Sequence, residues 1–103
     1  MSAFELHPEA IEDIDEITEY FRDPRPGAAS QLVSEFFDAF ELLVQFPHHG
    51  FLRPELTGRP LRFKLVRKFL IAYAPDTEPL WVVAVVDARR SPRVIAAMLR
   101  GRE

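Results

Sequence analysis

Positively charged side chains recur at close spacing between residues 61 and 99. Arg62 and Lys64 are two positions apart, so an extended strand would place both side chains on one face. Arg67 follows them, and Arg89 and Arg90 are adjacent further along the chain. Guanidinium and ammonium groups gathered in this way bind phosphate or carboxylate groups. We therefore expect segment 61–99 to carry the working surface of the protein.

Catalysis would demand more than cations. Cleavage of a phosphodiester by a hydroxyl group needs a base for that hydroxyl, cations at the reacting phosphate and an acid for the leaving oxygen. The candidates are Lys64, Arg67, Asp87 and Arg90. Asp87 would ionise and repel phosphate unless an arginine pairs with it, and neither histidine nor tyrosine follows Ala88. The residue types thus favour binding over catalysis.

Charge is unevenly distributed along the chain. Carboxylates crowd residues 5–23, whereas eleven of the thirteen Lys and Arg residues lie between Arg53 and Arg102. The formal net charge of −3 argues against a surface that grips nucleic acid throughout. The alternative role for the cations is solubilising charge or exposed ion pairing with the acidic first helix, which contributes little stability.

Two amphipathic helices are predicted ahead of the basic segment. The first begins at Pro8 and ends near Arg22, and its apolar residues recur at three- and four-residue steps. The proline-rich cluster Asp23–Gly27 ends it. The second helix runs to about Phe46 with a wide apolar stripe. The short connection predicts an antiparallel pair, and the carboxylates of the first helix are expected to form a solvated outer face.

Four strands and a terminal helix complete the expected fold. The strands are Ala3–Leu6, Leu61–Leu65, Phe69–Tyr73 and Leu80–Val86, and residues 47–60 read as a loop. Ser91 as cap and Pro92 at the first position start a last helix, with Ile95, Met98 and Leu99 on one side. The prediction is one α+β domain over residues 1–103: a two-helix hairpin packed on a small, mainly antiparallel sheet.

The strand Leu80–Val86 is almost wholly apolar, which is typical of a strand covered on both faces. The helix hairpin can cover one face only. We expect the other face to expose Leu70, Ala72 and part of this strand, so that the isolated chain self-associates or dissolves poorly. Trp81 is a further candidate for an interface, because a buried indole needs a hydrogen-bond acceptor.

Several classes of site are not expected. The chain has no cysteine, which rules out a disulfide framework and a thiolate zinc site and fits a reducing cytoplasm. The longest apolar run is far shorter than the roughly 20 residues that span a bilayer. His48 and His49 lack a third ligand at suitable spacing. We expect a cytoplasmic protein without metal, cofactor or membrane contact.

The order and spacing of several motifs resemble the RelE/ParE family of bacterial type II toxin-antitoxin toxins over nearly the whole chain. They are FELHPEAIEDIDEITEYF, PHHGFLRPEL, LRFKLVRKFLIAYAPD and VVAVVDARRSPRVIAAMLRGR. In that family the last strand commonly ends in His, a small residue, a variable residue and Arg. Asp87 takes the His position here and Arg90 the Arg position. Arg62 and Tyr73 fall at the family's strand arginine and tyrosine, while Ala74 replaces an arginine.

The resemblance implies a toxin neutralised by a cognate antitoxin whose C-terminal segment wraps it as a hetero-oligomer. The ParE-like branch, which inhibits DNA gyrase by binding, is favoured because no catalytic base is found. Target binding is assigned to Arg62, Lys64, Arg89 and Arg90, and antitoxin binding to Leu70, Ala72 and Trp81. The alternatives are a ribosome-dependent mRNA endoribonuclease and a non-toxic homologue that acts only in complex assembly.

Overall fold

The computed structural model describes residues 3–21 and 27–102, so most of the predicted connection Asp23–Gly27 lies outside the described residues. Its elements, in chain order, are β1 (Phe4–Leu6), α1 (Pro8–Phe21), α2 (Ala28–Gln45), β2 (Arg62–Val66), β3 (Phe69–Ala74), β4 (Leu80–Asp87) and α3 (Pro92–Arg100). The predicted helices and strands are thus confirmed. Within the described ranges, no helix is both long and apolar enough to cross a membrane.

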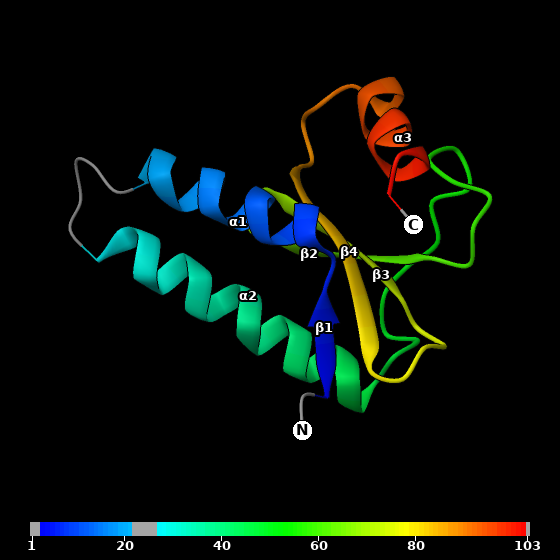
Figure 1. Ribbon diagram of the computed structural model, residues 1–103, viewed down its shortest axis with the longest axis horizontal. Coiled ribbons are helices and arrows are strands. Elements are labelled where there is room, and N and C mark those ends of the chain that lie inside the picture. Colours follow the sequence, from blue (N-terminus) through cyan, green and yellow to red (C-terminus); the bar gives the residue numbers. More distant parts are fainter. Residues whose placement is uncertain (1–2, 22–26, 103) are drawn as a thin grey trace.

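The four strands form one sheet in the order β1-β4-β3-β2. β1 runs parallel to β4, while the β4–β3 and β3–β2 pairs are antiparallel, which confirms the mainly antiparallel α+β fold. Figure 1 shows α1 and α2 side by side as a hairpin, with α3 and the segment before β2 lying away from them. The two groups of elements cover opposite faces of the sheet.

The helix hairpin packs on one face through the apolar stripes that the sequence predicts. Phe36, Phe40 and Leu43 of α2 are completely buried against Ile71 and Val85 of the sheet. Phe36 also meets Phe69 edge to face, with ring centroids 5.6 Å apart. Burial of large apolar side chains in this layer therefore fixes the hairpin on the sheet.

A bulge in β4 changes which face its residues present. Ala72 pairs with Ala84, but the next residue, Tyr73, pairs with Val82, so Val83 is an extra residue on β4. As a result Val83 and Ala84 both join the core on the α3 side. The apolar run of β4 thus serves two cores within the same chain.

The second face of the sheet is filled, and the expectation that it is exposed is wrong. Leu70 and Ala72 are only 2% and 3% exposed. Ile95 and Leu99 of α3 cover them together with Leu56 from the segment before β2. A nine-residue helix that folds back over the sheet supplies the cover that we expected from a partner. The predicted self-association therefore loses its physical basis.

Both ends of α3 are held by hydrogen bonds. The Ser91 hydroxyl accepts the Val94 N–H at 3.4 Å, as predicted for a cap followed by Pro92. At the other end Arg59 donates from Nη1 to the carbonyls of Leu99 at 2.7 Å and Arg102 at 2.5 Å. The guanidinium thus adds a side-chain donor to two backbone carbonyls at and just beyond the C-terminal end of α3.

The segment before β2 is pinned to the sheet by Tyr73. Its hydroxyl donates to the Pro47 carbonyl at 2.6 Å and accepts the Gly50 N–H at 2.9 Å. Burial raises the pKa of Tyr73 above its ordinary value. Gly50 leaves no space for a side chain, because a Cβ there would lie 2.5 Å from the Tyr73 hydroxyl and 2.7 Å from the Phe63 carbonyl oxygen.

Candidate functional site

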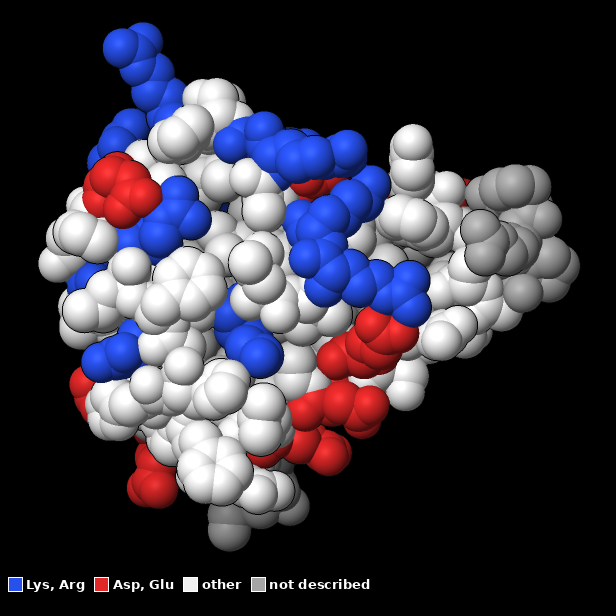
Figure 2. Space-filling view, turned by 180° about the vertical axis from the view of Figure 1, so that it is seen from behind, with Lys and Arg blue, Asp and Glu red and all other residues white. Residues whose placement is uncertain are grey.

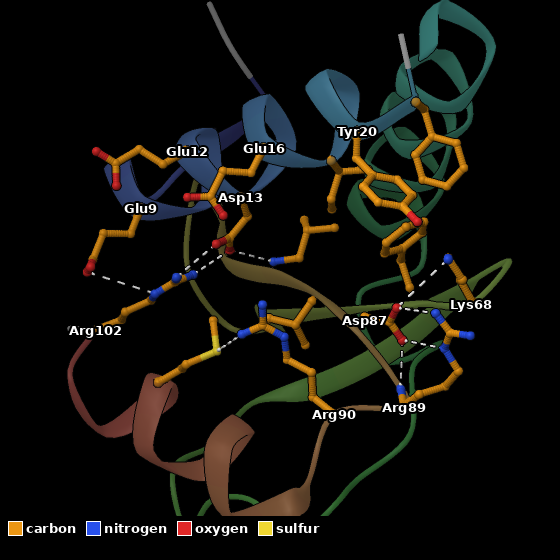
Figure 3. A pocket seen from close by; sticks show the side chains of 16 residues that line it. Glu9, Glu12, Asp13, Glu16, Tyr20, Lys68, Asp87, Arg89, Arg90 and Arg102 are labelled. Carbon is orange, nitrogen blue, oxygen red and sulfur yellow. Dashed lines mark hydrogen bonds and ion pairs between the residues drawn. The ribbon is translucent and has the colours of Figure 1, made fainter. Parts of the chain in front are cut away.

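A cleft of about 570 Å³ opens where β4 ends, between α1, the β2–β3 turn and α3 (Figure 3). We call it the α1–α3 cleft. Its acidic wall comes from α1, and its basic side chains come from the turn, the β4–α3 connection and the C-terminal segment. The charged residues lining it are Glu9, Glu12, Asp13, Glu16, Lys68, Asp87, Arg89, Arg90 and Arg102. The cleft thus brings the acidic and basic parts of the sequence face to face.

Asp87, at the family's histidine position, is held as a carboxylate. Its Oδ1 accepts the backbone N–H of Arg89 at 2.9 Å and the side-chain Nε–H at 3.1 Å, and its Oδ2 lies 2.9 Å from Arg89 Nη2. Lys68 Nζ is 3.9 Å away. The side-chain and backbone hydrogen bonds from Arg89 lower the pKa of Asp87 to about 2, with a further contribution from Lys68. The arginine partner that the sequence demanded is therefore present.

Lys68 was not singled out from the sequence, yet it links the cleft to the aromatic edge of α1. Its Nζ lies 5.3 Å from the ring centroid of Phe21, 5.6 Å from that of Phe69 and 6.0 Å from that of Tyr20. Such distances allow cation–π attraction. The folded chain assembles this contact from α1 and the β2–β3 turn, so spacing along the sequence carries no signal for it.

Arg90 is the cation of the cleft that the rest of the chain leaves available. Its Nη1 lies 3.9 Å from the Met98 sulfur, a weak acceptor, and no ion pair engages it among the described residues. In Figure 3 its side chain rises into the cleft from the α3 side. Arg89, in contrast, is committed to Asp87. A carboxylate or phosphate in the cleft could therefore pair with Arg90 without breaking an existing ion pair of that side chain.

The predicted cations do not form one surface. Arg62 lies opposite Tyr73, and Tyr73 lies opposite Val82, five residues before Asp87 on β4. At about 3.3 Å per residue, five residues correspond to roughly 16 Å along the strand between the level of Arg62 and the cleft end of the sheet. Figure 2 shows the side opposite to that in Figure 1, where Lys and Arg side chains lie in separate groups among acidic and uncharged ones.

Arg62 and Lys64 contact the segment before β2. Arg62 Nη1 donates to the Gly50 carbonyl at 2.8 Å, and Lys64 Nζ lies 3.2 Å from His49 Nε2. His48 turns to a different partner, with its Nε2 3.1 Å from Asp76 Oδ1. Among the residues that the structure describes, no group of three or more His, Asp or Glu could hold a metal ion.

Arg67 is bound to α2. Its Nε donates to Glu35 Oε1 at 2.8 Å and its Nη2 to Glu35 Oε2 at 2.5 Å. The hydrogen bonds lower the pKa of Glu35 and raise that of Arg67. Of the four nuclease candidates, only Asp87 and Arg90 therefore share a cleft, while Lys64 and Arg67 are engaged elsewhere.

A buried ion pair between Asp13 and Arg102 closes one end of the cleft, and sequence reasoning missed it. Arg102 is 7% exposed and donates from Nη2 to Asp13 Oδ1 at 2.9 Å, from Nη1 to Asp13 Oδ2 at 2.5 Å, and from Nη1 to the Val83 carbonyl at 3.1 Å. Asp13 also accepts the Val85 N–H at 3.0 Å. The pair thus provides hydrogen-bond partners for the Val83 carbonyl and the Val85 N–H at the β4 bulge. These two groups lie beyond Val82, the last β4 residue that pairs with β1.

A weak signal for Asp13 exists in the sequence. It follows Ala10 by three residues and precedes Ile17 by four, so it falls on the apolar side of α1. A carboxylate on that side must meet a partner when the helix packs. Nothing local identifies Arg102 as the partner, because 89 positions separate the two residues.

The proposed antitoxin contacts lie in different settings. Leu70 and Ala72 are covered by α3, so an antitoxin could reach them only by displacing that helix. Trp81 is half-buried at the margin of the second core, and its ring centroid lies 5.6 Å from that of His7. Contact of an antitoxin with these residues stays a prediction.

Comparison with known proteins identifies a family for the chain. No curated protein matches the chain. Residues 4–92 match the family described as the ParE toxin of the type II toxin-antitoxin system, parDE. The match runs from β1 to the first residue of α3 and includes Asp87 and Arg90. The chain belongs to the ParE toxin family of type II toxin-antitoxin systems.

Proposed function

We propose that this ParE toxin stops growth by binding a macromolecular target without cutting RNA, that DNA gyrase is the target, and that a cognate antitoxin neutralises it. The main support for binding without RNA cleavage is that Arg89 and Lys68 hold Asp87 as a carboxylate. A carboxyl group with a pKa of about 2 is a poor proton acceptor at neutral pH, and it holds no proton to donate.

The rest of the cleft also supports binding. The histidines His7, His48 and His49 do not line it, and Tyr20, its one tyrosine, is next to Lys68. The acidic wall from α1 would repel a nucleic-acid backbone. A protein surface, in contrast, can supply a carboxylate for Arg90, and arginine is among the residues that dominate binding energy in protein interfaces. These features favour a protein target such as gyrase.

The test measures whether the purified toxin inhibits the supercoiling of DNA by purified gyrase. Arg90→Ala should raise the toxin concentration for half-inhibition at least about tenfold, as expected for a central arginine in an interface. Arg93→Ala is the matched control, because Arg93 is exposed on α3 and does not line the cleft. Asp87→Asn should retain inhibition. If Arg93→Ala weakens inhibition as much as Arg90→Ala, or if the wild-type chain does not inhibit gyrase, the gyrase assignment is refuted.

One contact favours a second candidate, a ribosome-dependent mRNA endoribonuclease. His49 Nε2 lies 3.2 Å from Lys64 Nζ, which places an imidazole base beside a cation on the β2 edge. This function predicts codon-phased cuts in translated mRNA that disappear in His49→Ala and Lys64→Ala. Intact transcripts during growth arrest would eliminate it. Normal growth after induction without the antitoxin would leave only a role in complex assembly.

A further inference from the structure

Both walls of the α1–α3 cleft carry charged side chains that form no ion pair among the described residues. Glu12 and Glu16 are one turn apart on α1 and exposed, and no ion pair engages either of them among the described residues. On the other wall the Arg90 side chain has the Met98 sulfur as its hydrogen-bond partner, and no ion pair engages it among the described residues. The Arg102 guanidinium is bound to Asp13 and lies 3.8 Å from Glu9. Its hydrogen bonds to Asp13 raise the pKa of Arg102, and the charge of Glu12 also helps to raise it.

These charges call for a ligand that carries both signs. Like charges one turn apart on a helix repel each other, so a cation between Glu12 and Glu16 would be favourable. Arg90 would in turn accept a carboxylate. Between the walls, Ile17 and Met98 supply apolar surface. A polypeptide can present a basic, an apolar and an acidic side chain together, whereas the charged groups of a nucleic acid at neutral pH are its anionic phosphates.

We propose that the α1–α3 cleft binds a segment of the antitoxin that places a Lys or Arg at Glu12 and Glu16 and an Asp or Glu at Arg90. This inference rests on the proposed neutralisation by an antitoxin. Two points favour this occupant. The sheet face around Leu70 is filled by α3, whereas the cleft is open to a ligand without displacement of a helix. A segment seated in the cleft would also cover Arg90, the side chain assigned to target binding.

The decisive measurement is the affinity of the purified toxin for the antitoxin encoded by the adjacent reading frame, measured by calorimetry without gyrase or ribosomes. The double variant Glu12→Lys, Glu16→Lys should weaken binding by about 30-fold or more, because reversed charges would face the antitoxin's cation. Arg90→Glu should weaken it similarly. The control is Asp15→Lys, which reverses one charge on the side of α1 that does not line the cleft.

The outcomes separate this inference from the proposed function. If the wild-type toxin binds and the charge-reversed variants bind equally tightly, the cleft is not the antitoxin site, although neutralisation stands. If Asp15→Lys weakens binding as much as the double variant, the effect is one of overall charge and the inference fails. If the wild-type chain does not bind, both fail. Circular dichroism of each variant checks that α1 remains folded.

Discussion

Replacement of Arg102 by alanine tests the ion pair that joins the two ends of the chain. In the wild-type protein the side chains of Arg102 and Asp13 are only 8% and 11% exposed. The substitution removes both hydrogen bonds to Asp13 and the one to the Val83 carbonyl. Asp13 would then keep the Val85 N–H as its hydrogen-bond donor, and no cation among the described residues would lie within hydrogen-bond reach of its charge.

Removal of one partner from a buried ion pair costs about 3–5 kcal/mol, because it leaves an uncompensated charge. The lower end applies here, since Asp13 retains one backbone donor and lies at the margin of the core. We therefore expect Arg102→Ala to lower the free energy of unfolding by about 3 kcal/mol. For a domain near this size, about 4–8 °C per kcal/mol corresponds to a melting temperature lower by ~12–24 °C.

Urea unfolding followed by circular dichroism measures this loss. Arg100→Ala is the control, because Arg100 is exposed and lies two residues earlier in the last turn of α3, where surface changes stay within about 0.5 kcal/mol. A double-mutant cycle with Asp13→Asn should give a coupling energy above about 1 kcal/mol. If Arg102→Ala destabilises no more than Arg100→Ala, the pair does not hold the C-terminal segment.

Three further outcomes are expected. Tyr73→Phe should cost about 1–3 kcal/mol in urea unfolding, because the Gly50 N–H and the Pro47 carbonyl lose their buried partner. Gly50→Ala should be destabilising too, and unchanged stability would contradict the close approach of the Tyr73 hydroxyl. The Asp87 carboxyl should titrate in NMR near pH 2 and move toward its ordinary 3.8 in Arg89→Ala. Because the folded-state pKa of Asp87 is lowered, its stabilising contribution is present above about pH 3.8 and falls away toward pH 2. Asp87→Asn should therefore flatten the dependence of stability on pH in that window.

Much of the fold was predictable because periodicity is a local property. The three- and four-residue steps of α1 and α2 and the alternation in β2 each specify an element and its buried face. The cap at Ser91 and the proline after it marked the start of α3. For the same reason the sequence indicated that Asp87 would need an arginine partner to tolerate a phosphate nearby. Arg89, the partner in the structure, lies only two residues away.

Long-range placement was not predictable. The bulge at Val83 breaks the alternation of β4, so the sequence alone could not assign its residues to two cores. The cover that α3 provides for Leu70 depends on how the chain turns after β4. The division of the cations between the cleft and the β2 edge depends on strand register, which only the pairing of whole strands defines.

The amino-acid sequence by itself determined the elements and the apolar faces of the two long helices, which follow from local spacing and residue chemistry. The exchange of a family histidine for Asp87 follows from the resemblance to the family. Only the tertiary structure decided that the second sheet face is closed by α3, that Arg102 pairs with Asp13, and that Arg90 is left available in the α1–α3 cleft. Those facts depend on contacts between residues far apart in the chain, whose free energies are settled by packing of the whole domain.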